Sequence, residues 1–358
     1  MQKLKFTKSH SDELFYTELK GCVNLFIERE LNSKNLRREF WFKALACFLL
    51  CWGSYAFLLT VNLSSFVMIL LAILFGFSGL IFGFSIGHDA AHRVVTGRCR
   101  VDNLIHFFSF ITIGIDPTLW QLRHLRSHHM FPNVSGSDID IDHNPFFRFS
   151  EKHPLKKMYK FQHIYAPFAY SLALLHSLFW RDWVYLFSKE YEWMRKGINK
   201  FKLRLSFILH KITHITVMFV IPYLILDVAL WQIILVYILM SMISSLIFVT
   251  MLVGTHFFDE ASYPDVDDHG RLSTSWAVHN LETSCDWNPD SIISAYLSGG
   301  ANSHAAHHLF PNLCHIYYRH INFIIAELTE KYDIKYHRMS LWDMMKSHFR
   351  FLKRMGRE

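Results

Sequence analysis

The chain has 358 residues, of which 51% are hydrophobic and 23 are histidine, and its formal net charge is +7 at pH 7. That length would hold two water-soluble domains, but the apolar residues gather in long runs, which favours one membrane-embedded unit. The excess lysine and arginine borders those runs, so it indicates contact with an anionic lipid surface and argues against nucleic-acid binding.

Two stretches without lysine or arginine, residues 44–92 and 212–270, predict pairs of membrane-spanning helices. Each stretch is much longer than the ~20 residues of one crossing, so each is expected to cross the membrane twice. The predicted spans are about 43–61, 64–86, 207–227 and 231–254.

The distribution of positive charge also predicts the topology. The two outer turns contain no lysine or arginine, so all 37 positive residues lie at or beyond the other ends of the spans. The positive-inside rule then places both termini and the segments 87–206 and 255–358 in the cytoplasm. We expect an all-α integral membrane protein in which residues 1–358 form one domain and these two segments form a cytosolic helical cap. Within the cap, Ile164–Leu178 is apolar but contains Pro167, which predicts a helix at the membrane interface.

Three clusters of histidines stand beside the apolar runs. They are His88 and His92; His124, His128 and His129; and His304, His307 and His308. Residues three or four apart share one face of a helix, so each cluster presents several imidazoles on one side. Imidazoles without cysteine suit iron, zinc or copper, and this number of ligands exceeds what one metal holds. The pattern predicts a dimetal site in the cap, although any single pair could instead bond lipid headgroups and carbonyls.

Four further histidines lie outside the three clusters and could also bind a metal. His256 ends the fourth span, where an ionisable group is costly and is a functional candidate by default. His279 is a further candidate ligand, with a hydrogen-bonded loop histidine as the alternative. His210 and His214 also have ligand spacing, but Lys211 beside them indicates the headgroup zone. We expect snorkelling or a helix contact there, and no metal.

Alternating acids follow the second cluster at Asp138, Asp140 and Asp142. Such a run could bind Ca²⁺ or form a solvated turn. It could also supply carboxylates that accept hydrogen bonds from ligand imidazoles, which orients the ligands.

These motifs resemble the three histidine boxes of the membrane fatty acid desaturases. The boxes match Gly87–His92, His124–His129 and His307–Pro311. Further matching segments are Asp138–Ile141, Gln162–Pro167, Trp276–His279, Gly299–Asn302 and Ser347–Lys353. The resemblance covers nearly the whole chain and is strongest to a bacterial branch similar to linoleoyl-CoA, delta-6-type, desaturases.

The resemblance implies an enzyme that uses O₂ at a non-haem di-iron centre, with two Fe per chain, to introduce a double bond into an acyl chain. The implied ligand pool is His88, His92, His124, His128, His129, His256, His279, His304, His307 and His308. The family pattern uses slightly fewer imidazoles, so one of these would lie just outside the ligand set. We expect Asp89 and Asp138 to support ligand imidazoles and Asn302 to hold a metal-bound water. No other acid or base is needed, because the metal centre carries the difficult chemistry.

Two departures from the family pattern matter. His304 stands where many delta-6-type members have Gln, which weakens any transfer of the double-bond position. The chain contains no His-Pro-Gly-Gly haem signature, so we expect electrons from a separate carrier such as ferredoxin or cytochrome b5. The fatty acyl substrate could be carried by CoA, by a lipid or by acyl carrier protein. The expected location is the bacterial cytoplasmic (inner) membrane, with the active site on the cytosolic face.

Other functions fit parts of this pattern. A hydroxylase, epoxidase or acetylenase could share the scaffold. A zinc-dependent membrane hydrolase or a metal transporter is a different class. Transporters usually place ionisable ligands in the middle of a span, whereas the histidines here lie at the span ends. A non-catalytic scaffold would leave the clustering unexplained.

Overall fold

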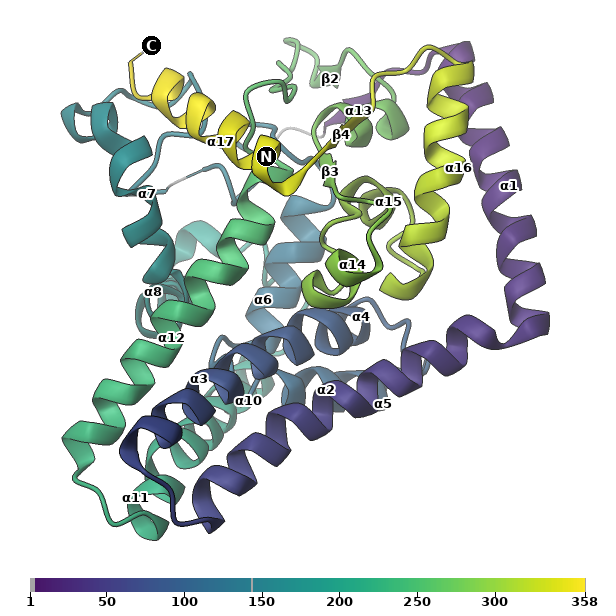
Figure 1. Cartoon of the computed structure of the whole chain (residues 1–358). Coiled ribbons are helices and arrows are strands. Elements are labelled where there is room, and N and C mark those ends of the chain that lie inside the picture. Colours follow the sequence, from purple (N-terminus) through teal and green to yellow (C-terminus); the bar gives the residue numbers. More distant parts are fainter. Residues whose placement is uncertain (1–3, 143, 358) are drawn as a thin grey trace. The chain divides into compact units, whose positions relative to one another are not determined.

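The computed structural model describes residues 4–142 and 144–357 (Figure 1). The described residues are mostly helical, which confirms the predicted all-α class. Within them the strands are β1 (Lys5–Phe6), β2 (Arg271–Leu272), β3 (Cys285–Trp287) and β4 (His337–Met339). They form two parallel pairs, β1 with β2 and β3 with β4.

Among the described residues, four helical segments are long and apolar enough to cross a membrane. They are Asn35–Thr60, Ser65–Ala91, Lys200–Ile225 and Leu230–Thr255. The predicted number of spans is therefore confirmed, although the first and third of these helices begin seven or more residues earlier than predicted. The first turn of the first helix contains Arg37 and Arg38. Long basic side chains can stay in helices by extending toward water, so hydropathy alone places the start too late.

The chain divides into two compact units, each built from segments that are far apart in the sequence. Unit 1 comprises Met1–Phe40, Ser127–Ala166 and Met251–Glu358, and unit 2 comprises Trp41–Arg126 and Pro167–Thr250. The single domain expected over residues 1–358 stays a prediction.

Unit 2 contains most of the spanning helices. Its elements are most of α2 (Asn35–Thr60), α3 (Ser65–Phe82), α4 (His88–Ala91), α5 (Cys99–Ser109), α6 (Pro117–Arg123), part of α7 (Gln162–Ser171), α8 (Ala173–His176), α9 (Asp182–Phe187), α10 (Lys200–Ile215), α11 (Ile221–Ile225) and most of α12 (Leu230–Leu252). Large side chains fill the space between them: Tyr55 of α2 stacks on Phe75 of α3 at 4.7 Å between ring centroids. Gly76 lies directly against Met240 of α12, where a Cβ would collide. Such small residues allow spanning helices to approach closely.

Lys211 and His214 are buried inside unit 2, and Lys211 pairs with a protein carboxylate; its location at headgroup depth stays a prediction. The Lys211 side chain is 10% exposed, and its Nζ lies 2.6 Å from Asp182 Oδ2. The sequence pattern gave no sign of this partner, which makes the buried charge tolerable. His214 Nδ1 lies 2.6 Å from the Ile111 carbonyl oxygen and Nε2 lies 2.9 Å from the Tyr237 hydroxyl. The expected helix contact of His214 is therefore confirmed.

Unit 1 contains α1 (His10–Ser33), α13 (Trp276–Glu282), α14 (Ile292–Ser298), α15 (His304–Leu309), α16 (Tyr318–Lys331), α17 (Leu341–Met355) and the strands. Helix α1 lies alongside α16 (Figure 1), with Phe15 edge-on to Tyr332 at 5.7 Å. The β3–β4 pair joins Cys285 to His337 and so ties the segment before α17 to the segment between α13 and α14.

Side-chain hydrogen bonds to backbone carbonyls hold α17 in place. His348 Nδ1 lies 2.5 Å from the Phe257 carbonyl oxygen, directly after the fourth span. At the end of α17, Arg148 donates to the Met355 carbonyl at 2.7 Å and Gln162 donates to the Leu352 carbonyl at 2.7 Å. Helix α17 is thereby fixed against the segment that follows His256.

Candidate metal centre

Three histidines meet in unit 2. His88 begins α4, His92 ends it, and His124 follows α6. The Nε2 atom of His124 lies 3.1 Å from Nε2 of His88 and 3.1 Å from Nε2 of His92. The start of helix α6 is fixed by its N-cap residue, Asp116, whose carboxylate accepts the Leu119 N–H at 2.8 Å.

Aromatic rings enclose this cluster. The Trp120 ring stacks on His124 at 4.6 Å with an interplanar angle of 22°. It also meets His88 edge-on at 5.7 Å and Phe110 at 5.2 Å. His106 lies beside the same tryptophan at 5.8 Å, and burial lowers the pKa of His106 to about 3. The spacing of Trp120 and His106 in the sequence gave no sign that they line the cluster.

Four buried histidines meet in unit 1. They are His128, His256, His304 and His308, and each offers a nitrogen within 4.8 Å of the others. The Nε2 atom of His256 is central, 2.7 Å from Nε2 of His304 and 3.0 Å from Nε2 of His308.

The opposite ring nitrogens of this cluster are held by acceptors. His256 Nδ1 donates to the Thr283 carbonyl at 2.7 Å, which directs Nε2 toward the cluster. His128 Nδ1 lies 3.2 Å from Asp138 Oδ2. Asp138 is fully buried and also accepts the Asn133 N–H at 3.1 Å. Among the three alternatives for these acids, this geometry favours an acceptor that orients a ligand imidazole. Asp89 is more loosely placed, with Oδ1 3.9 Å from His88 Nδ1.

The remaining candidate histidines also lie in unit 1. The His129 ring lies 4.5 Å from that of His307 and stacks on His308 at 4.5 Å. His307 Nδ1 lies 3.3 Å from the Tyr318 hydroxyl. His279 hydrogen-bonds the backbone of Pro132, and its Nε2 is buried without a hydrogen-bond partner among the described residues.

Asn302 uses its side chain within the turn before α15. Its Oδ1 accepts from the Ser298 hydroxyl at 3.2 Å and its Nδ2 donates to the Asn288 carbonyl at 3.3 Å. These bonds shape the turn that leads into the third cluster.

The second histidine cluster is divided between the units. His124 belongs to the unit 2 group, whereas His128 and His129 belong to unit 1. The structure therefore does not gather these three imidazoles into one group, and the dimetal site expected from the clusters stays a prediction. The segment His124–His128 is a π-helical turn, which changes the angular spacing from that of the assumed α-helix.

Both groups fit a metal by their chemistry. Nitrogens bound at ~2.1 Å to one metal stand roughly 3.0–3.4 Å apart at right or tetrahedral angles. Ring nitrogens in both groups lie near this spacing: 3.1 Å for His88 and His124, 3.0 Å for His256 and His308, and a shorter 2.7 Å for His256 and His304. Burial lowers the pKa of His92 to about 3 and holds that of His256 well below its usual value. The imidazoles of His92 and His256 are therefore neutral, which is the form that binds metals.

A buried carboxylate supports the third cluster. Ser303 gives α15 no side-chain cap. Asp286 of β3 instead accepts the Ala305 N–H at 2.8 Å through Oδ1 and the Tyr336 hydroxyl at 2.5 Å through Oδ2. Burial raises the pKa of Asp286 to about 6. A single aspartate at this distance from the histidines forms no recognisable motif, so sequence reasoning missed it.

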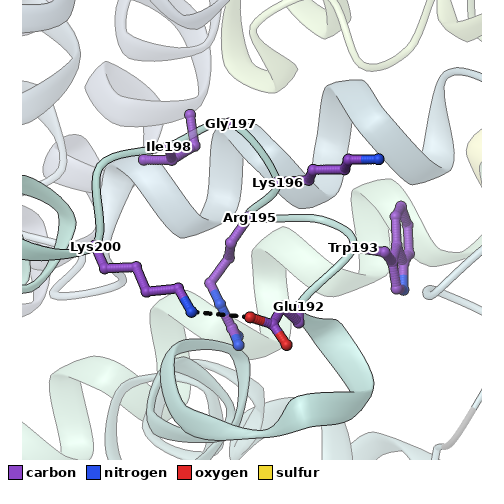
Figure 2. A pocket seen from close by; sticks show the side chains of 7 residues that line it. All are labelled: Glu192, Trp193, Arg195, Lys196, Gly197, Ile198 and Lys200. Carbon is purple, nitrogen blue, oxygen red and sulfur yellow. Dashed lines mark hydrogen bonds and ion pairs between the residues drawn. The ribbon is translucent and has the colours of Figure 1, made fainter.

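A surface pocket in unit 2 is unrelated to the histidines. Figure 2 shows its lining, from Glu192 to Lys200, with the Lys200 ammonium 2.9 Å from the Glu192 carboxylate. It contains no candidate ligand, so the histidine groups remain the candidate centre.

Comparison with known proteins agrees with this geometry. A model of the family described as fatty acid desaturase matches residues 64–340. The acyl-lipid (8-3)-desaturase of Physcomitrium patens is 25% identical over 98% of this chain and 74% of its own length. The probable Delta(5) fatty acid desaturase C of Dictyostelium discoideum is 27% identical over 99% and 78%. The sn-1 linoleoyl-lipid 6-desaturase of Synechocystis sp. is 23% identical over 99% and 98%. The chain therefore belongs to the fatty acid desaturase family, as a membrane-bound oxidoreductase that desaturates acyl chains.

Proposed function

We propose that this desaturase binds two iron ions per chain, one at each histidine group, and acts on the acyl chain of a membrane lipid. The observation that carries the proposal is the convergence of ring nitrogens within each group. His256 Nε2 has two other Nε2 atoms within 3.0 Å, and His124 Nε2 has two at 3.1 Å. Neutral imidazoles so close together direct their nitrogen lone pairs toward one point, and a metal ion at that point would accept them.

The proposed ligands follow the two units. They are His88, His92 and His124 in unit 2, and a set in unit 1 drawn from His128, His129, His256, His279, His304 and His308. His307 is proposed as a further ligand of the centre. Asp138 and Asp89 are proposed to orient His128 and His88, and Asn302 to hold a water. Asp286 is proposed to fix the first turn of α15, because its carboxylate accepts the Ala305 N–H.

Iron is favoured over zinc by the reaction. Desaturation is an oxidation, and Zn²⁺ has no redox chemistry. All-imidazole ligation suits iron, and iron when bound supplies the activation of O₂ needed to remove hydrogen from an unactivated carbon chain. Burial in the chain lowers the pKa values of His92 and His256, and Trp120 stacks on His124 with Phe110 beside it.

The electron balance requires a second protein. Removing two hydrogens from a –CH₂–CH₂– unit yields two electrons and two protons, whereas reducing O₂ to two waters takes four of each. Two electrons and two protons must therefore come from outside, and we propose a separate carrier of the ferredoxin or cytochrome b5 type as the electron source.

The substrate and location are proposed from two observations. The relatives in Physcomitrium patens and Synechocystis sp. are named for acyl-lipid and linoleoyl-lipid substrates, which supports a lipid-bound acyl chain here. The absence of lysine and arginine from residues 44–92 and 212–270 supports an orientation with the histidine groups on the cytosolic side. A bacterial cytoplasmic membrane fits that orientation.

The test compares His256→Ala with His269→Ala. His269 is exposed and belongs to neither histidine group, so its variant controls for the loss of an imidazole. We expect the His256 variant to lose iron and unsaturated product in lipid extracts of expressing cells, and the His269 variant to keep both. Full iron and product in the His256 variant would refute the assignment. Stoichiometric zinc with activity retained, in protein made with ample iron, would instead favour a hydrolase.

A further inference from the structure

A short segment of unit 1 presents three different ridges along one helix. Residues Lys157–Phe161 form a 3₁₀ helix, in which residues three apart lie directly above one another. Helix α7 continues from Gln162 without a break. Side chains spaced by three therefore form ridges along Lys157–Phe161 that α7 extends to Ile164, and Leu155 lies in the extended segment just before them.

The first ridge is apolar and exposed. It consists of Leu155, Met158, Phe161 and Ile164, which are 50%, 44%, 54% and 66% exposed. Met158, Phe161 and Ile164 recur at helical spacing, and Leu155 immediately precedes the helix, so the exposed apolar residues here are more concentrated than the scattered ones of ordinary surfaces.

The second ridge is basic and the third is buried. Lys157, Lys160 and His163 form the basic ridge, and both lysines are exposed. Tyr159 and Gln162 form the buried ridge. Gln162 accepts the Arg148 N–H at 2.9 Å and donates to the Leu352 carbonyl, so the segment is held rigidly with its other two ridges outward.

The end of α17 enlarges the basic surface. Gly356 lies against the backbone of Tyr159 and Lys160, where a Cβ would collide. Lys353 and Arg357 are exposed there. The pKa of His163 is lowered mainly by burial and further by the positive charges of these two residues. Cations from two segments therefore border one apolar ridge.

We propose that this ridge pair, residues 155–164 with the end of α17, is a docking surface for the headgroups and upper acyl region of an anionic phospholipid leaflet. An interfacial segment combines apolar side chains that enter the acyl boundary with lysines that remain among anionic headgroups. The alternation of Met158 and Phe161 with Lys157 and Lys160 matches that chemistry. An acidic protein partner would use the cations but would leave the apolar ridge unexplained. The surface adjoins the segment Ile164–Leu178 that the sequence predicts to be interfacial and shares Ile164 with it, and none of its residues is a proposed ligand.

The experiment uses the full chain in lipid nanodiscs. A nitroxide is attached at Phe161→Cys after the accessible cysteines Cys22, Cys47 and Cys99 have been replaced by serine. Collisions with O₂, which concentrates in the bilayer, are compared with collisions with a water-soluble nickel complex. The discs contain either phosphatidylcholine alone or phosphatidylcholine with one third phosphatidylglycerol. A label at Trp342→Cys, on an exposed part of α17, is the control.

We expect the Phe161 label to gain several-fold in its O₂-to-nickel collision ratio in the phosphatidylglycerol discs. Lys157→Glu with Lys160→Glu, or high salt, should abolish the gain. The Trp342 label should report water in both discs, and unchanged iron content should show that the charge variant is folded. A Phe161 label equally in water, or equally inserted, in both discs would overturn the proposal. So would protection of that label only on adding reduced ferredoxin, which would identify a protein-docking surface.

Discussion

Asp286→Ala should disrupt the third histidine cluster although Asp286 is not a proposed ligand. The substitution removes the acceptor for the Ala305 N–H and the Tyr336 hydroxyl. Each buried donor left without an acceptor costs about 1–3 kcal/mol, so the expected loss of unfolding free energy is about 2–6 kcal/mol. Because Ala305 directly follows His304 in α15, that loss falls on the helix that carries His304, His307 and His308.

Asp286→Asn separates the hydrogen bond from the charge. An asparagine keeps an oxygen for the Ala305 N–H and a nitrogen that can donate to the Tyr336 hydroxyl oxygen. Because the site already disfavours charge, raising the pKa of Asp286 to about 6, loss of the charge should cost less than about 1 kcal/mol. The Asn variant should therefore retain most of the iron that the Ala variant loses.

The assay is iron per chain and thermal unfolding in detergent, with Asp290→Ala as the matched control. Asp290 lies nearby in the sequence and forms an exposed ion pair with Arg338 at 2.9 Å. Exposed pairs contribute about 0–1 kcal/mol, so this variant should resemble the wild type. Normal iron content and unfolding in Asp286→Ala would refute the capping argument, as would an Asn variant no better than the Ala variant.

Four further predictions address other parts of the molecule. His304→Ala should abolish iron binding and turnover, whereas His304→Gln should keep a reduced activity, since an amide is a poorer ligand than imidazole; full activity of the Ala variant would exclude His304 as a ligand. Burial lowers the pKa of His348 to about 4, so this group stabilises the fold above its unfolded value near 6.5, and that stability is lost as pH falls toward 4. Between pH 7 and 5 the wild type should therefore lose about 2 kcal/mol more than His348→Gln, as measured by denaturant unfolding; equal pH dependence would contradict this. Lys211→Met should cost about 3–5 kcal/mol by leaving the Asp182 carboxylate buried alone, and adding Asp182→Asn should recover part of it in the same unfolding assay. Reporter fusions at both termini and near residue 150 should all read cytoplasmic, and an external signal at residue 150 would contradict the four-span topology.

The sequence predicted features that depend on local spacing or on charge. The spans followed from the absence of lysine and arginine, and the box histidines followed from i, i+3 and i+4 spacing. Their assignment to two groups did not follow, because the π-helical turn at His124–His128 changes the spacing that an α-helix would give.

Partners distant in the sequence were also beyond prediction. Lys211 was interpreted as a headgroup residue because Asp182, its partner, lies in a different helix. Asp286 and His348 bond to backbone atoms of α15 and of Phe257. Any residue type at the partner position supplies the same backbone atom, so no sequence motif reveals such a bond. Long-range contacts of this kind need the fold before they can be seen.

The position of α17 has a consequence for biosynthesis. The histidines of unit 1 are complete once His308 has been translated, but Tyr336 and His348, which brace Asp286 and the segment after His256, are translated later. In a nascent chain, the unit 1 histidines therefore lack the contacts of Tyr336 and His348 until α17 has folded back, although the fourth span before His256 has already been translated. The metal loading that we propose for unit 1 is therefore expected to follow that step, after the membrane spans have been inserted.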